Sequence, residues 1–190
     1  MARLWNPSSV RIDPNAASEE KAYRELMIAE REKINADRIQ ICRELKNVYG
    51  SRFCGGIQPC SYSKALCPDI VLPMHMTLKS NYIKLMKRSD ICIGSAGLEK
   101  SIGWKTGEYV AAARAIVCEE PAYLLPGSFE NGINYLSYHD PESCLTAVDT
   151  LSHSPDLICQ MQQANELYYQ NYLRPERQIL NALRICGIPV

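Results

Sequence analysis

The sequence predicts an α/β fold in which helices cover a parallel β-sheet. Short apolar runs rich in Ile, Val and Cys alternate along the chain with amphipathic helical patterns. This alternation is typical of parallel sheets with right-handed crossovers. The 190 residues suit one well-buried core, and 46% hydrophobic with 22% charged residues is an ordinary globular composition. We therefore expect a single domain over residues 1–190.

The expected strands are short apolar runs bounded by Gly, Pro, Asp or Ser. Strands buried on both faces have this character, because helices cover both sides of a parallel sheet. The runs are Arg52–Ile57, Asp69–Leu72, Ile91–Gly94, Ala115–Cys118 and Tyr135–Tyr138. Met1–Trp5 is a candidate for one more strand, or for the end of one.

The expected helices fill most of the gaps between these runs. The longest, Ser18–Tyr49, is charged in its first half, and Gly50 follows it as a stop signal. Its apolar stripe consists of Ile34, Ile41, Leu45 and Val48. Asp140 and Ser154 each precede a proline, a combination favoured at helix starts. The other helices are expected at Asn81–Lys87, Thr106–Ala113 and Pro141–Leu151, after Ser154, and after Arg174-Pro175.

The charge balance, hydropathy and cysteine pattern argue against a nucleic-acid binder, a membrane-spanning protein, a secreted protein and a metal-binding protein. With 21 basic and 21 acidic side chains, the chain lacks the basic excess of a general nucleic-acid binder. No apolar run approaches the ~20 residues needed to span a bilayer, and the first residues do not form a signal peptide. The nine cysteines are scattered and form no metal-ligand cluster with the three histidines. We therefore expect a soluble cytoplasmic protein with reduced thiols, no metal site and no nucleic-acid partner.

The most favourable place for a ligand is the stretch Gly94–Glu108. In parallel sheets, ligands bind beyond the carboxyl ends of the strands, and this stretch directly follows the expected strand Ile91–Gly94. Two further glycines, Gly97 and Gly103, precede a helix start near Thr106. The backbone N–H groups and the dipole of a helix N-terminus favour an anion such as phosphate.

Two charged side chains strengthen this interpretation. Lys105 adds a positive charge at the expected helix start, and Glu108 in the first helical turn could accept hydrogen bonds from ribose hydroxyls. The helix dipole alone also favours Glu in a first turn. Neither the P-loop pattern nor the dinucleotide-binding fingerprint is present. From the residues alone, a phosphate site and a turn that binds nothing both remain open.

A family resemblance becomes visible around this stretch. Residues 103–109 read Gly-Trp-Lys-Thr-Gly-Glu-Tyr. The surrounding matches are Ser89-Asp90, Gly94-Ser95, Ala111-Ala112, Ile116-Val117 and, downstream, Asp140-Pro141-Glu142-Ser143. This pattern resembles the C-terminal, donor-binding domain of bacterial GT-B glycosyltransferases of the group-1-like kind. The resemblance is densest from residue 70 onward.

The resemblance implies a single Rossmann-like, doubly wound parallel sheet flanked by helices. It places Glu108 on the donor ribose, Lys105 and Arg3 on the donor diphosphate, and residues 97–101 near the donor sugar. Leu72–Thr77 would then lie at the nucleobase. The implied donor-binding residues are Arg3, Gly97, Glu99, Ser101, Gly103, Lys105, Thr106 and Glu108. No catalytic residue is assigned.

One position departs from the family pattern. Many retaining members have two glutamates separated by seven residues, whereas Glu99 lies one position further from Glu108 and Lys100 occupies the family position. Either a loop insertion absorbs the difference, or Glu99 is a solvated surface residue.

The implied function is that of a glycosyltransferase donor domain. It would bind a nucleotide-diphosphate sugar for metal-independent transfer to an unknown acceptor, with no cofactor besides the donor substrate. The chain would lack the N-terminal acceptor domain, would be truncated at its first strand, and would require that domain or a partner chain. Two alternatives remain: a non-catalytic nucleotide-sugar-binding or assembly module, and a sugar-nucleotide epimerase with His75 in its cleft.

Overall fold

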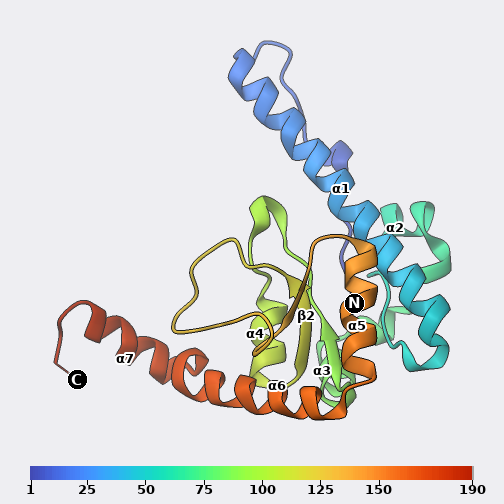
Figure 1. Cartoon of the computed structure of the whole chain (residues 1–190). Helices are drawn as coiled ribbons and strands as arrows, with labels where there is room; N and C mark the ends of the chain where they lie inside the picture. The colour runs from blue at the N-terminus through green and yellow to red at the C-terminus, as the bar shows by residue number, and fades with distance from the viewer. Residues whose placement is uncertain (190) are drawn as a thin grey trace. The chain divides into compact units, whose positions relative to one another are not determined.

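The computed structural model describes residues 1–189, which form two compact units (Figure 1). The first unit comprises Met1–Leu85, Gly97–Glu99 and Asp140–Leu145. The second comprises Met86–Ala96, Lys100–His139 and the chain from residue 146 onward. The expected single domain over residues 1–190 stays a prediction.

The first unit is organised by the long helix α1 (Ser18–Tyr49), which has the bounds expected from the sequence. Gly50 ends the helix with a positive φ of 54° and donates its N–H to the carbonyl of Lys46. Ile41 and Leu45 are buried, as expected for the apolar stripe, but Val48 is 55% exposed. Val48 shares the face of Ile41 but lies in the last turn of the helix, so the buried part of the stripe ends before it.

The core of the first unit joins α1 to three extended segments. A buried cluster contains Leu4, Cys42, Ile57, Cys67 and Ile70. The extended segments are linked by single parallel bridges, one between Ala2 and Ile57 and one between Ile57 and Val71. The strands expected at residues 1–5, 52–57 and 69–72 are therefore reduced to isolated bridges.

Local helical turns explain why these three segments do not form longer strands. Gly50–Arg52 and Pro68–Ile70 are 3-10 helices, so each takes up the first residues of an expected strand. Further short 3-10 helices lie at Pro7–Ser9, Met74–Thr77 and Leu98–Lys100. The backbone can close such turns within three or four residues, before any pairing with a neighbouring strand.

The six-residue helix α2 (Ser61–Leu66) was not expected from the sequence, because it is too short to show a helical period. It begins with a reciprocal cap. The Cys60 thiol accepts the N–H of Ser63 at 3.3 Å, and the Ser63 hydroxyl accepts the N–H of Cys60 at 2.9 Å. Helix α3 (Lys79–Arg88) follows the Met74–Thr77 turn.

The second unit is built on a parallel sheet of three strands in the order β1-β2-β3. The strands are β1 (Ile91–Ile93), β2 (Ala115–Glu119) and β3 (Leu136–Tyr138). Helices α4 (Trp104–Ala111) and α6 (Pro155–Tyr168) both pack against the central strand β2 and against one another. The predicted α/β class, with a parallel sheet flanked by helices, is therefore confirmed.

From Pro141 onward the described chain is mainly helical, and prolines mark the helix starts. Helix α5 (Pro141–Ser152) is capped as expected, since Asp140 Oδ1 accepts the N–H of Ser143 at 2.7 Å. Helix α6 begins at Pro155 and passes into a π-helical turn, Tyr169–Leu173. Helix α7 (Pro175–Ile185) packs against this turn, and within α7 no residue is buried.

A pair of buried asparagines fastens α6 to the loop before β3. Asn165 is fully buried, and its side-chain amide donates to the carbonyls of Arg114 and Asn134, both at 2.8 Å. Its Oδ1 accepts a hydrogen bond from the Asn134 side chain at 3.1 Å. Buried amides need such partners, because an unsatisfied polar group loses its hydration without compensation.

We expect Asn165→Leu to lower the free energy of unfolding by about 2 kcal/mol or more, because it strands the Asn134 amide and two buried carbonyls. Urea denaturation followed by circular dichroism measures the change. Gln163→Leu is the matched control, since Gln163 is exposed on the same helix and should change stability by less than about 0.5 kcal/mol. Equal losses in the two variants would contradict a structural role for the asparagine pair.

Candidate functional site

Both ends of the turn between β1 and α4, up to Ala96 and from Lys100 onward, belong to the second unit, and the turn begins at the carboxyl end of β1. Gly94 is buried there, donating its N–H to the carbonyl of Val117 at 2.9 Å. Its own carbonyl accepts the hydroxyl of Tyr138, the last residue of β3, at 2.9 Å. The Tyr109 hydroxyl of α4 donates to the carbonyl of Ile93 at 3.2 Å. The end of β1 is thus held from both β3 and α4.

Close packing brings the start of α4 against the end of β1. A Cβ placed on Gly94 would lie 3.4 Å from the Cys118 Cβ and 3.4 Å from the Thr106 Oγ1. A Cβ on Gly103 would lie 3.9 Å from the carbonyl oxygen of Ser95. The two ends of the loop between β1 and α4, at Ser95 and Gly103, therefore lie close together.

The start of α4 differs from the expected one by two residues. The helix begins at Trp104 rather than near Thr106, with Gly103 at the N-cap. Glu108 therefore lies in the second turn of the helix, and its placement in the first turn was wrong. The effect of the helix dipole fades within the first turn, so the dipole alone explains a glutamate at position 108 less well than it would explain one in the first turn. Lys105 does lie in the first turn, half-buried.

A carboxylate that sequence reasoning missed also reaches this turn. Glu119, the last residue of β2, accepts the backbone N–H of Ala96 with its Oε2 at 2.5 Å. The neighbouring Glu120 accepts the hydroxyl of Tyr135 at 2.8 Å. Burial raises the pKa of Tyr135, and the hydrogen bond to Glu120 raises it further. The signal was present in the sequence, because both glutamates directly follow the buried run Ala115–Cys118.

The eight predicted donor-binding residues fall in both compact units. Ser101, Gly103, Lys105, Thr106 and Glu108 belong to the second unit; Gly103 is the N-cap of α4, and the last three lie in its first two turns. Arg3, Gly97 and Glu99 belong to the first unit. That all eight form one donor site stays a prediction.

Within the first unit, Arg3 and Glu99 have partners of their own. The Arg3 guanidinium is exposed and lies 5.0 Å from the ring centroid of Trp5, a cation–π distance. Glu99 accepts the Tyr23 hydroxyl at 2.8 Å and donates its N–H to Glu30 at 2.6 Å. The hydrogen bond to Glu99 raises the pKa of Tyr23.

The backbone around Glu99 is strained. Glu99 and Lys100 both have a positive φ, 56° and 53°, which is uncommon for residues with a side chain. The contacts of Glu99 with Tyr23 and Glu30 compensate for this local cost.

His75, the histidine of the epimerase alternative, is exposed on the 3-10 turn Met74–Thr77 of the first unit. Over residues 1–189, no group of three or more His, Cys, Asp or Glu side chains is arranged to hold a metal ion. In the same range, no helix is long and apolar enough to cross a membrane.

The cysteines Cys92 of β1 and Cys118 of β2 are buried, as expected for residues of apolar strands. Burial raises the pKa of each thiol to about 12.

No family model, curated protein or solved structure matches the chain. The likeness to GT-B glycosyltransferases therefore stands on the sequence pattern alone, chiefly residues 103–109. The β1–α4 turn brings a helix start, the cation of Lys105 and the carboxylate of Glu119 to the carboxyl edge of a parallel sheet.

We expect Gly94→Val to lower the free energy of unfolding by about 1–3 kcal/mol, because its side chain would force β2 and α4 apart. Gly107→Ala is the control on the same helix. A Cβ on Gly107 would meet no described atom within 4 Å outside the helix backbone, and this change should be neutral or stabilising by up to about 1 kcal/mol. Thermal and urea unfolding measure both. Equal tolerance of the two changes would contradict the close contact between β1 and α4.

Proposed function

We propose that the chain binds a nucleotide diphosphate at the β1–α4 turn, as the donor-binding part of a glycosyltransferase that uses a nucleotide-diphosphate sugar. The observation that supports this is the packing of the α4 start, with Lys105, against the end of β1. In open parallel sheets this position, beyond the carboxyl end of a strand and before a helix, is where phosphate-bearing ligands bind.

The spacing of Lys105 and Glu108 suits the two parts of a nucleotide diphosphate. Residues three apart on a helix share a face, and the rise between them is about 4.5 Å. Lys105 lies nearer the helix start, where a diphosphate gains from both the ammonium charge and the dipole. Glu108, one turn further along, offers carboxylate oxygens to the ribose hydroxyls.

The same arrangement suits transfer without a metal ion. Negative charge grows on the leaving diphosphate as the bond to the sugar breaks, and fixed cations and backbone N–H groups stabilise that charge. In this proposal Lys105 and the α4 start supply the stabilisation. The acceptor and the groups that activate it would come from an acceptor domain or a partner chain. In the non-catalytic alternative, the same site binds the donor without transferring its sugar.

Titration calorimetry with UDP, GDP, dTDP and ADP tests the binding. We expect one of the four to bind saturably and Lys105→Met to weaken binding at least about tenfold, since a charge-assisted contact contributes about 1.5–3 kcal/mol. Lys64→Met is the control, because Lys64 is an exposed lysine of the first unit. A folded wild-type protein that binds none of the four diphosphates would overturn the proposal.

The proposed contact of Glu108 with the ribose is tested by comparing nucleotides with and without their sugar hydroxyls. For the diphosphate that binds, Glu108→Ala should reduce the preference for that nucleotide over its 2′,3′-dideoxy analogue by about tenfold, because the analogue lacks the sugar hydroxyls (both of them in UDP, GDP and ADP, the 3′-hydroxyl in dTDP) that donate to the carboxylate. Calorimetry of wild type and variant with both ligands gives the ratio. An unchanged preference would exclude Glu108 from ribose recognition. Release of labelled sugar from the donor then separates a transferase from a non-catalytic module.

Removing the charge of Glu119 should strengthen diphosphate binding, whereas removing the charge of Lys105 should weaken it. Glu119→Gln keeps an acceptor for the Ala96 N–H but removes a negative charge from the turn. We expect the diphosphate to bind about three- to tenfold more tightly to this variant, because the change removes the repulsion between the Glu119 carboxylate and a phosphate bound at the turn. Glu142→Gln is the control, because Glu142 is an exposed side chain in the first turn of α5. Unchanged affinity in Glu119→Gln would mean that the diphosphate binds away from the β1–α4 turn.

A further inference from the structure

The first residue of α4 is the most exposed aromatic residue in the described part of the chain. Trp104 directly follows the N-cap Gly103 and is 85% exposed. The next most exposed aromatic residue, Tyr123, is 56% exposed. Packing against the core therefore does not account for this indole. Its apolar area remains available to a ligand, and ligand sites are commonly lined by aromatic rings.

Trp104 shares the outer side of α4 with Glu108 and Lys105. Successive residues of an α-helix are turned by about 100° around its axis. Trp104 is therefore turned by about 40° from Glu108 in one direction, and Lys105 by about 60° in the other. The buried Val110 and Thr106, which contacts the end of β1, lie on the opposite side of the helix. One side of α4 thus carries an aromatic ring, an ammonium and a carboxylate.

The parts of a nucleotide-diphosphate sugar follow this order along the helix. In such a molecule the ribose is joined to the diphosphate, and the diphosphate is joined to the sugar. With the ribose at Glu108 and the diphosphate at Lys105 and the helix start, the sugar lies beyond the first turn. Helical side chains lean toward the N-terminus of their helix, so the indole of Trp104 extends in the same direction.

The face of an indole suits a pyranose ring. A pyranose with equatorial hydroxyls presents its axial C–H groups on the faces of the ring. These C–H groups carry a small positive partial charge, whereas the face of an aromatic ring is negative. Stacking also removes apolar area of both rings from water. The indole therefore gains from contact with the sugar, and not with the charged diphosphate.

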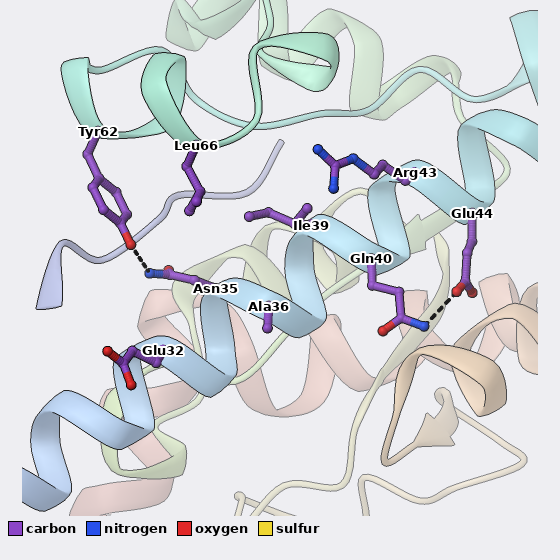
Figure 2. Close-up of a pocket in the computed structure, with 9 residues that line it drawn as sticks. All are labelled: Glu32, Asn35, Ala36, Ile39, Gln40, Arg43, Glu44, Tyr62 and Leu66. Carbon is purple, nitrogen blue, oxygen red and sulfur yellow. Dashed lines mark hydrogen bonds between the residues drawn. The ribbon is translucent and has the colours of Figure 1, made fainter.

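A groove in the first unit is large enough for a nucleotide but lacks this chemistry. It has a volume of about 570 Å³ and lies along α1, with Leu66 of α2 on its other side (Figure 2). Glu32 and Glu44 line it and would repel a diphosphate. Among the described residues that line it, the cation is Arg43, which forms two hydrogen bonds of 2.8 Å with Asp69. The groove therefore does not favour an anionic donor.

We propose that the donor carries a pyranose sugar and that this ring stacks on the indole of Trp104. The inference rests on the proposed nucleotide site and adds to it the class of sugar and the residue that binds it. The stacked ring holds the bond between sugar and diphosphate next to Lys105, where negative charge on the leaving group is stabilised.

Titration calorimetry tests the contact with the sugar. For the diphosphate that binds, its glucose, galactose and mannose derivatives are compared with the diphosphate itself. We expect Trp104→Ala to weaken binding of at least one derivative about fivefold or more, and to change the affinity for the diphosphate less than about twofold. Trp104→Phe should keep most of the affinity, because it retains an aromatic face. Leu66→Ala is the control, since Leu66 lines the groove of the first unit, and it should change neither affinity.

The results distinguish failure of the sugar contact from failure of the nucleotide site. If the folded wild-type protein binds none of the four diphosphates, both proposals are overturned. If a diphosphate binds and requires Lys105, but Trp104→Ala weakens no derivative more than the diphosphate, the nucleotide site stands and the sugar contact is overturned. Circular dichroism checks that each variant is folded.

Fluorescence quenching observes the indole directly. The chain has two tryptophans, so Trp5→Phe leaves Trp104 as its one tryptophan. In this variant, the sugar derivative should protect Trp104 from quenching by acrylamide more than the diphosphate alone does, because a stacked ring covers the indole. Equal quenching with both ligands bound would overturn the stacking.

Discussion

The second unit depends on the burial of one short strand. Ala115, Ile116 and Val117 of β2 are fully buried between two parallel neighbours. A strand covered on both faces must satisfy its backbone through its neighbours and its side chains through helices. Helix α6 provides part of this cover, with the buried Met161 sulfur 3.2 Å from the Ile116 nitrogen. The pairing of β2 with β1 then fixes where the β1–α4 turn begins.

Helices were predictable from this sequence because their ends carry local signals. Gly50 stops α1, Asp140 caps α5, and Pro155 and Pro175 open α6 and α7. Each signal acts within a few residues, either through a local hydrogen bond or through the fixed φ of proline, so it does not depend on the rest of the fold. The same logic explains the failures in the first unit, where 3-10 turns consumed the starts of two apolar runs.

The position of the candidate site was predictable, but its composition was only partly so. The rule that ligands bind beyond the carboxyl ends of parallel strands directs attention to Gly94 and the residues after it. It does not say that Glu119 will fold back onto Ala96, a contact between residues 23 apart. That contact requires β1 and β2 to be neighbours in a defined register, and only the assembled sheet supplies it.

The contact between Glu119 and Ala96 has two opposite consequences for anion binding. A carboxylate oxygen 2.5 Å from a backbone N–H shows that this turn presents a donor to an anionic oxygen, which is the interaction that a phosphate would also make. In the proposed site, the same carboxylate would repel a phosphate that approaches Lys105. A diphosphate would then gain from the ammonium and the helix start and lose from Glu119, so its affinity would depend on its distance from that carboxylate. A ligand held mainly at Lys105 and Glu108, along α4 and away from β2, keeps the gain and reduces the loss.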